Sequence, residues 1–193
     1  MWPEIKMYLR NFFTLLGLVC SCGLLFKPEE ASGRTMTAYD FSFKSIVGEP
    51  LPLSSFEGKV ILVVNTASQC GFTSQYSGLV EIWKRYKNKG FVVLAVPSND
   101  FGGQEPGTLN EIKTFCEVTF GVDFPMTEKV AVTGKDPHPF YRWAKTELGA
   151  RAKPRWNFHK YLVGRDGKLI DWFSSVTSPS SSRLTKSIER ALR

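Results

Sequence analysis

The chain has 193 residues, of which 42% are hydrophobic and 22% charged, values typical of one globular domain with a short extension. Its formal net charge of +7 is scattered along the sequence without a run of like charges, which argues against a nucleic-acid-binding arm. The basic balance is compatible with attraction to anionic small molecules or to a membrane surface.

The first predicted element is an apolar stretch, residues 12–26, that contains no charged side chain. Lys6 and Arg10 precede it and small residues follow at positions 31–33, which is the order of a basic segment, an apolar segment and a cleavage zone. A membrane-spanning helix needs about 20 apolar residues, more than this stretch offers. The pattern favours a signal peptide or a membrane anchor over residues 1–35, and with it an exported or membrane-anchored protein.

A second interpretation starts the protein at Met36, within a plausible first segment of the domain. Residues 1–35 would then be a translated upstream stretch, and the protein would be cytoplasmic. Both interpretations leave one domain over residues 36–193.

Two uninterrupted apolar runs predict strands in the middle of a sheet. Residues 59–65 and residues 91–96 are rich in Val, Leu and Ile, which suits strands that are buried on both faces. Before them, Gly48, Glu49 and Pro50 separate two short apolar segments and predict a turn.

Between these two strands, apolar residues at helical spacing predict a helix over residues 74–87. Thr73 or Ser74 can cap its start, and Gly90 can end it. A strand, a helix and a second strand in this order form a right-handed unit whose two strands are parallel.

The second half of the chain predicts three helices and a hairpin. Residues 108–111 form a Thr-x-x-Glu capping box that opens one helix, and residues 138–148 and 181–192 have helical patterns. Residues 161–173 predict a hairpin around an Asp-Gly turn. The fold class is therefore α/β with a central mixed β-sheet flanked by helices, the thioredoxin-like arrangement, which by itself specifies no activity.

The chain contains four cysteines, two in the N-terminal stretch and two in the body, namely Cys20, Cys22, Cys70 and Cys116. Two body cysteines are too few for a disulfide-stapled scaffold. With only two histidines and no CxxC or HxxxH spacing, the sequence predicts no metal site, and no cofactor is expected. Cys70 and Cys116 are then either inert core residues or redox residues.

Cys70 follows the first predicted strand and precedes its helix. Sites of parallel sheets gather beyond the carboxyl ends of the strands. Free backbone N–H groups and the positive end of the helix dipole favour a thiolate there, which is the nucleophilic form. Gly71 leaves room for close approach of a substrate. The alternative is a buried loop cysteine that behaves as a small hydrophobic residue.

Two redox families do not fit the residues around Cys70. The absence of CxxC disfavours disulfide exchange of the thioredoxin kind. The peroxiredoxin pattern requires Pro and Thr before its cysteine, where this chain has Val63 and Ala67.

Three segments resemble the motifs of glutathione peroxidases. Residues 64–73 resemble the nucleophile motif of that family, residues 99–107 its second motif, and residues 156–158 its third. The motifs occur in the family's order and spacing, and the similarity extends from about Tyr39 to the C-terminus. The resemblance implies a catalytic tetrad of Cys70, Gln104, Trp156 and Asn157.

The residue types of this tetrad suit peroxide reduction. A thiolate that attacks a peroxide needs hydrogen-bond donors and a proton for the leaving oxygen. The amides of Gln104 and Asn157 and the indole of Trp156 are neutral donors at any working pH. The attack would oxidise Cys70 to a sulfenic acid. Each donor also has a structural interpretation, namely a loop residue, a core aromatic residue and a turn residue.

The reductant is left open between thioredoxin and glutathione. Family members with Cys at the position of Cys70 often use thioredoxin and a second, resolving cysteine, for which Cys116 is the body candidate. Cys116 lies one residue earlier than the family's resolving cysteine, and one residue turns a helical side chain by about 100°. It then shares a face with Ile112 and Phe115, which favours a buried, inert thiol. Ser98 occupies a position where many members carry a third cysteine.

The segment between Gly149 and Trp156 is short, whereas tetrameric members of the family carry a longer insertion there. The resemblance is therefore to the monomeric type that reduces phospholipid hydroperoxides, with a site open to bulky peroxides and with contact to membrane lipid. Arg151, Lys153 and Arg155 lie in this segment and are candidates for binding glutathione carboxylates, lipid phosphates or an acidic patch on thioredoxin. The alternative is a solvated basic loop.

The main hypothesis is a thiol peroxidase that reduces hydrogen peroxide and organic or lipid hydroperoxides. An alternative is a peroxide sensor, in which oxidised Cys70 passes a disulfide to a partner protein. A third is an inert binding module on the same fold, in which Cys70 has no chemical role.

Overall fold

The central sheet has the strand order β4–β3–β5–β6 in the computed structural model, which describes residues 35–193. Its strands are β3 (Val60–Thr66), β4 (Phe91–Pro97), β5 (Lys160–Val163) and β6 (Leu169–Phe173). β3 and β4 are parallel, while β5 pairs antiparallel with both β3 and β6. Every residue of β3 and β4 is buried, as their apolar runs require. The prediction of a mixed sheet is confirmed.

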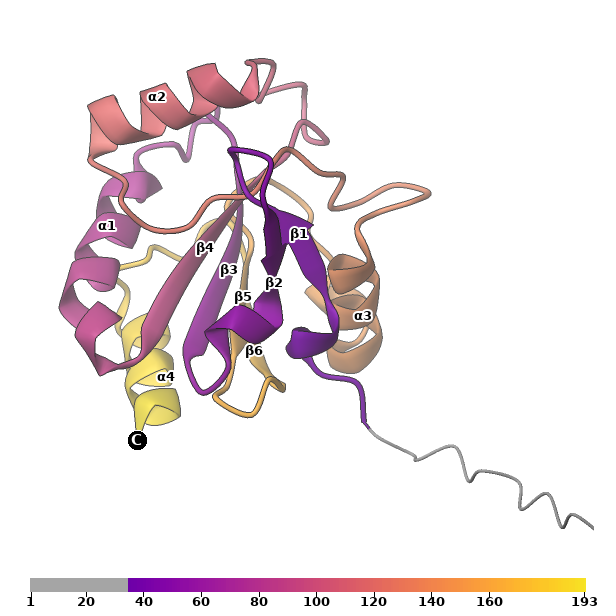
Figure 1. Ribbon diagram of the computed structural model, residues 1–193, viewed down its shortest axis with the longest axis vertical. Coiled ribbons are helices and arrows are strands. Elements are labelled where there is room, and N and C mark those ends of the chain that lie inside the picture. The colour runs from indigo at the N-terminus through magenta and orange to yellow at the C-terminus, as the bar shows by residue number, and fades with distance from the viewer. Residues whose placement is uncertain (1–34) are drawn as a thin grey trace, which may run out of the picture. The chain divides into compact units, whose positions relative to one another are not determined.

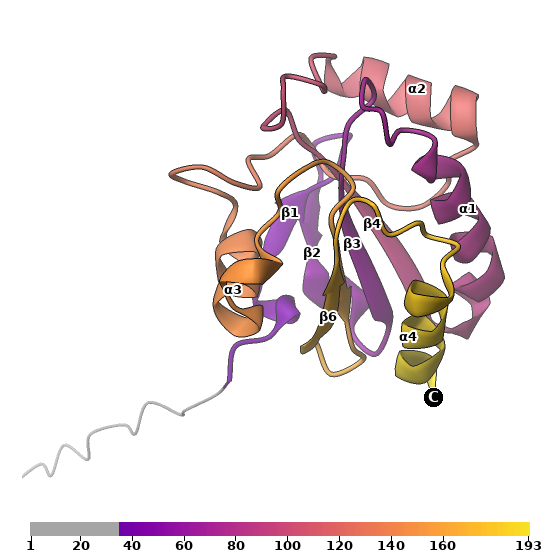
Figure 2. The ribbon, with the colours of Figure 1, turned by 180° about the vertical axis from the view of Figure 1, so that it is seen from behind.

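Helices cover both faces of this sheet, as Figures 1 and 2 show from opposite sides. Helices α1 (Gln75–Tyr86) and α4 (Ser182–Leu192) pack on one face, and α3 (Pro139–Leu148) packs on the other. Helix α2 (Leu109–Phe120) lies across the end of the sheet at which β3 and β4 finish. Helices α1, α3 and α4 agree with the predicted ones to within two residues at each end, and α2 begins where its capping box predicts.

The N-terminal part of the domain adds a small hairpin. Strands β1 (Ser42–Lys44) and β2 (Pro50–Pro52) pair antiparallel around the predicted turn, in which Gly48 has a φ of +91°. Phe43 of β1 is buried in the same apolar cluster as helix α3. The predicted signal peptide or upstream stretch over residues 1–35 lies, except for its last residue, outside the described residues.

Of the predicted helix caps, the capping box of α2 is confirmed, Gly90 lies one 3₁₀ turn beyond the end of α1, and the side-chain cap of α1 is wrong. Thr108 and Glu111 form the capping box of α2, because the Thr108 N–H donates to the Glu111 carboxylate at 2.7 Å and the Glu111 N–H donates to the Thr108 hydroxyl at 3.3 Å. Gly90, with a φ of +82°, ends the short 3₁₀ turn that follows α1. Neither Thr73 nor Ser74 caps α1 through its side chain, because the Thr73 hydroxyl binds the backbone around Cys70 instead.

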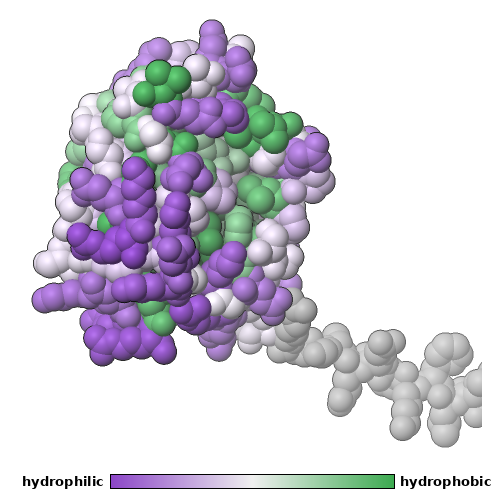
Figure 3. Space-filling model, turned by 60° about the vertical axis from the view of Figure 1, so that its left-hand side comes forward, coloured by the Kyte–Doolittle hydropathy of each residue, from purple (hydrophilic) through white to green (hydrophobic). Residues whose placement is uncertain are grey.

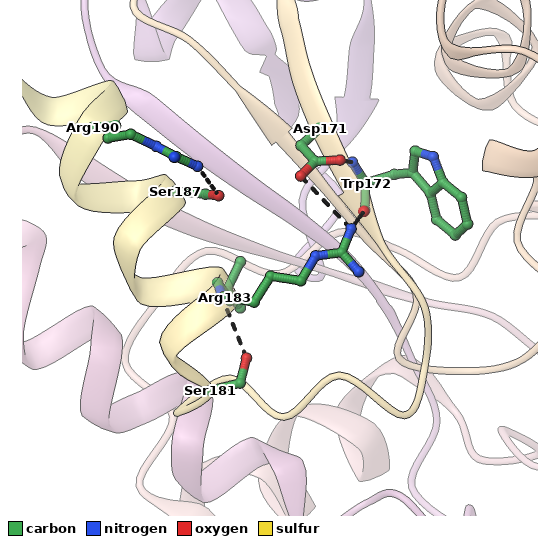
Figure 4. A network of polar contacts seen from close by, with 7 residues as sticks. Asp171, Trp172, Ser181, Arg183, Ser187 and Arg190 are labelled. Atoms are coloured by element: carbon green, nitrogen blue, oxygen red, sulfur yellow. Dashed lines mark hydrogen bonds and ion pairs between the residues drawn. The ribbon is translucent and has the colours of Figure 1, made fainter.

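Polar contacts attach helix α4 to the neighbouring strand β6 (Figure 4). The Arg183 guanidinium donates to the carbonyl of Trp172 at 3.5 Å and forms an ion pair with Asp171 at 3.8 Å. Ser181 caps the helix by accepting the Leu184 N–H at 3.4 Å. Exposed ion pairs contribute little to stability, so the buried side of α4 carries most of its attachment.

The surface seen from the side of α1 is mainly hydrophilic, with hydrophobic residues in small groups (Figure 3). Val118 on α2 and Val176 after β6 are the most exposed of the large hydrophobic side chains in the described part of the chain. Within residues 35–193, no helix combines the length and the apolar character needed to cross a membrane.

Candidate active site

Cys70 lies in a tight turn between strand β3 and helix α1 and is 8% exposed. Its Sγ accepts the backbone N–H of Phe72 at 3.4 Å. Its own N–H donates to the Thr73 hydroxyl at 3.0 Å, and that hydroxyl in turn binds the Cys70 carbonyl at 2.6 Å. The backbone is therefore held so that an N–H group points at the sulfur, an arrangement that stabilises a thiolate.

Gln104 lies in the loop between β4 and α2, and this loop is bonded to the Cys70 turn. The Gln69 N–H donates to the Gln104 carbonyl at 3.0 Å, and the Ser68 hydroxyl donates to the Glu105 carboxylate at 2.5 Å. Glu105 is fully buried, and this burial raises the pKa of its carboxyl group, while the bonds from Ser68 and the charge of Lys129 oppose the rise. The two loops are thus joined directly beside Cys70.

Asn157 connects the third motif to the second. Its Nδ2 donates to Oε1 of Gln104 at 3.0 Å, and the Asn157 side chain is fully buried. Trp156 is 40% exposed, with its ring 5.9 Å from that of Phe101. The Trp156 carbonyl accepts Nδ2 of Asn65, a residue of β3, at 3.2 Å. The amide pair of Asn157 and Gln104 is therefore connected to the Cys70 turn through the bond from Gln69 to Gln104, while the Trp156 indole lies against Phe101.

Phe158 follows Asn157 and has a φ of +63°. Among residues 35–193 it is the only non-glycine residue with a positive φ. A residue in this conformation costs on the order of 1–3 kcal/mol and persists where its surroundings fix it. Here the Phe158 N–H donates to the Asn65 carbonyl at 2.6 Å, and the buried Phe158 ring contacts the edge of Tyr76 at 5.4 Å. The strained turn directs the Asn157 side chain toward Gln104.

The predicted basic residues are found together beside this third motif. Arg151, Lys153 and Arg155 line a pocket of about 280 Å³ whose wall includes His159 and Trp172. Burial, helped by the nearby charge of Lys160, lowers the pKa of His159 to about 3, so its imidazole is neutral at ordinary pH. The pocket therefore has three cations on its rim and a neutral histidine in its wall.

Cys116 lies on the inner side of α2 and is fully buried. Burial raises the pKa of Cys116 to about 11. Ile112 on the same face is also buried, so the expectation of a core-facing position is confirmed. Both Cys70 and Cys116 are free thiols.

Several residues that shape the site were missed from the sequence. Thr73, Glu105, Gln75 and Lys160 were not predicted as site residues, although Glu105 lies inside the second motif. A carboxylate in a predicted motif, such as Glu105, or a lysine at the start of a strand, such as Lys160, indicates a site residue only when its burial is known. In the described part of the chain, no cluster of three His, Cys, Asp or Glu side chains could hold a metal ion.

Comparison with known proteins gives a consistent result. The family model described as glutathione peroxidase matches residues 38–145. The chain is 44% identical over 164 residues to a hydroperoxy fatty acid reductase of Synechocystis sp., covering 81% of this chain and 96% of that protein. It is 45% identical over 157 residues to a glutathione peroxidase-like peroxiredoxin of Schizosaccharomyces pombe, covering 80% and 98% of the two chains.

Solved structures agree on the fold. The crystal structure of Trgpx in apo form superposes with a TM-score of 0.67 at 36% identity, covering 82% of this chain and 97% of that one. A thiol:disulfide interchange protein of the thioredoxin family from Chlorobium tepidum superposes with a TM-score of 0.61 at 19% identity, covering 84% and 100% of the two chains. At that identity the second likeness establishes a thioredoxin-like fold and nothing finer.

Proposed function

The chain belongs to the glutathione peroxidase family, and on that premise we propose that Cys70 is the thiol that attacks the peroxide. The protein is an oxidoreductase that acts on peroxides with electrons from thiols. The observation that supports the assignment to Cys70 is the pair of bonds that joins three segments, distant in the sequence, beside the Cys70 turn. These bonds are Gln69 N–H to Gln104 carbonyl at 3.0 Å and Asn157 Nδ2 to Gln104 Oε1 at 3.0 Å.

In the proposed reaction, the Cys70 thiolate attacks one peroxide oxygen and the O–O bond breaks. Cys70 becomes a sulfenic acid, and the departing oxygen takes up a proton to leave as water or an alcohol. The amides of Gln104 and Asn157 and the indole of Trp156 are the donors that would stabilise the charge on sulfur and on the departing oxygen.

The sulfenic acid is then returned to the thiol by two reducing equivalents. A thiol attacks the Cys70 sulfur and releases water, and a second thiol breaks the resulting mixed disulfide. Cys116 is a poor first attacker while α2 is folded, because its thiol is buried and its pKa is about 11. We therefore assign the first attack to an external thiol, glutathione or thioredoxin, and a resolving role of Cys116 requires α2 to open.

The substrates we assign are hydrogen peroxide and organic or lipid hydroperoxides. The name of the Synechocystis relative, a hydroperoxy fatty acid reductase, supports a fatty acid hydroperoxide as one of them. The pocket beside the third motif, with Arg151, Lys153 and Arg155 on its rim, suits a carboxylate or a phosphate. We assign it to the anionic end of the reductant or of the lipid substrate.

A steady-state assay with glutathione or thioredoxin tests the function. Wild-type protein should turn over many equivalents of peroxide, and Cys70→Ser should reduce the rate to the uncatalysed background. Turnover that stops at one equivalent would replace the peroxidase with the sensor. Retention of activity in Cys70→Ser would remove Cys70 from the mechanism.

Mass spectrometry after one equivalent of peroxide tests the second half of the cycle. A sulfenic acid on Cys70, or its glutathione adduct with Cys116 still free, supports direct reduction by the external thiol. A Cys70–Cys116 disulfide formed without added thiol contradicts that assignment and makes Cys116 the resolving residue.

A further inference from the structure

Lys160, the first residue of β5, is fully buried and has no acidic partner within residues 35–193. Burying an ammonium group without a counter-charge is costly, and most proteins avoid it. The Lys160 Nζ instead donates to two neutral oxygens, the side-chain Oε1 of Gln75 and the carbonyl of Phe158, each at 2.7 Å.

Both acceptors belong to the catalytic arrangement. Phe158 carries the strained φ of +63° and directly follows Asn157. Gln75 is the first residue of α1, the helix that begins just after the Cys70 turn. Its Nε2 donates to the Ser175 carbonyl at 2.6 Å, so the amide is fixed at both ends. The ammonium of Lys160 therefore connects the turn that presents Asn157 with the helix that follows Cys70.

Within residues 35–193, the titratable groups near Lys160 are neutral or paired with other residues. His159 is neutral because its pKa is lowered to about 3, and the Tyr76 phenol stays protonated because burial raises its pKa well above the ordinary value. From α4, Arg183 lies over the ring of Phe173, the residue paired with Lys160 in β6, and it forms its own ion pair with Asp171. Burial accordingly lowers the pKa of Lys160 to about 7.

A buried cation at the first turn of a helix is also opposed by the helix dipole. A structural role alone would be served better by an apolar side chain, because well-packed apolar groups often match or exceed the stability of buried charges. A buried lysine at position 160 therefore lowers the stability of the fold. Its two hydrogen bonds hold two acceptors of the site, Gln75 Oε1 and the Phe158 carbonyl, at a fixed separation.

We propose that Lys160 is a positioning residue for peroxide reduction, whose two hydrogen bonds hold the Asn157–Phe158 turn against the start of α1 beside Cys70. The proposal rests on the proposed function of Cys70. It concerns the oxidative step, in which Asn157 must face Gln104 and the thiol, and not the binding of the reductant.

The test is single-turnover oxidation of Cys70 by hydrogen peroxide in Lys160→Met, in which the side chain keeps its length and loses its donors. We expect the second-order rate constant to fall by about tenfold to a hundredfold, as small misplacements of catalytic groups do. The KM for glutathione in steady state should stay close to wild type, and the midpoint of thermal unfolding should equal or exceed that of the wild type. The matched control is Lys168→Met, an exposed lysine in the β5–β6 turn, which should leave the rate unchanged.

Two further variants keep the proposal falsifiable if Lys160→Met does not fold. Gln75→Leu removes one acceptor without changing the lysine and should slow oxidation less than Lys160→Met. Lys160→Arg keeps the charge and the donors and should recover part of the rate. Oxidation within twofold of wild type in folded Lys160→Met or in Gln75→Leu would overturn the proposal. If instead Cys70→Ser were still active, the proposed function would fail independently of Lys160.

Discussion

The two cysteines of the domain occupy opposite environments within one apolar cluster. Cys70 lies in an irregular turn, where the Phe72 N–H points at its sulfur and the Thr73 hydroxyl fixes its backbone. Cys116 lies within a regular helix and is fully buried, and among the described residues no backbone N–H donates to its sulfur. Under the proposed function, a free backbone donor distinguishes the reactive cysteine from the inert one.

The largest expected effect comes from exchanging the two thiols for hydroxyls. Cys70→Ser should abolish peroxide turnover, because a serine hydroxyl is not ionised at working pH. Cys116→Ser should retain turnover with glutathione within about twofold, because an external thiol can attack Cys70 directly. Peroxide consumption under excess glutathione measures both. A collapse of turnover in Cys116→Ser would mean that α2 opens in each cycle.

Alkylation of the native protein compares the two thiols without mutation. We expect iodoacetamide to modify Cys70 at least on the order of a hundredfold faster than Cys116, because Cys116 reacts only when α2 opens. Peptide mass spectrometry over time gives both rates, and a denaturant-unfolded sample provides the reference in which they become equal. Equal rates in the native state would show that α2 is already open.

The environment of Cys70 can be weakened while the thiol is kept. Asn157→Ala removes the donor to Gln104 and should lower the rate of Cys70 oxidation by about tenfold to a hundredfold, somewhat less than the loss of a direct oxyanion donor. Asn110→Ala, an exposed position on α2, is the matched control and should have no effect. Stopped-flow fluorescence of Trp156 offers a suitable readout. An unchanged rate in Asn157→Ala would remove this amide from the reaction.

The smallest expected effect is on stability and concerns Cys116. Its pKa rises from 9.0 to about 11 in the folded protein, so on raising the pH the unfolded chain loses this proton first. The favourable contribution is complete below about pH 8 and is lost between about pH 9 and 11; at about 1.4 kcal/mol per pKa unit it amounts to roughly 2–3 kcal/mol.

Denaturant unfolding from pH 8 to pH 11 measures this contribution. Cys116→Ala should lose less stability over that range than the wild type, whatever its stability at pH 8. Parallel curves for the two proteins would indicate that the thiol titrates normally and is not buried in solution.

The parts of the fold that could be predicted are those that local sequence patterns determine. The buried runs of β3 and β4, the capping box at Thr108 and the turn before β2 each depend on neighbouring residues only. The wrong prediction, a side-chain cap at Thr73 or Ser74, concerns a hydroxyl with two possible partners. The Thr73 hydroxyl bonds to the backbone of Cys70, because the turn before α1 brings the Cys70 N–H and carbonyl within its reach.

The site could be predicted only as far as the family motifs reached. The resemblance named Cys70, Gln104, Trp156 and Asn157, but it could not give the burial of Glu105 or of Lys160. Both of those depend on contacts between segments far apart in the sequence, such as Ser68 with Glu105 and Gln75 with Lys160. A charge in a sequence is normally solvated, and only the assembled fold reveals that these two are not.

The position of helix α2 affects the order of the oxidation and reduction steps in the proposed catalytic cycle. Its capping box begins at Thr108, four residues after Gln104, and the same helix carries the buried Cys116. An opening of α2 that exposes Cys116 would therefore also release the loop that holds Gln104 against the Cys70 turn. While α2 is open and Cys116 is exposed, the site could not reduce a new peroxide. Oxidation of Cys70 and its resolution by Cys116 would therefore alternate in time. Whatever stabilises α2 would then set how long the oxidised form persists.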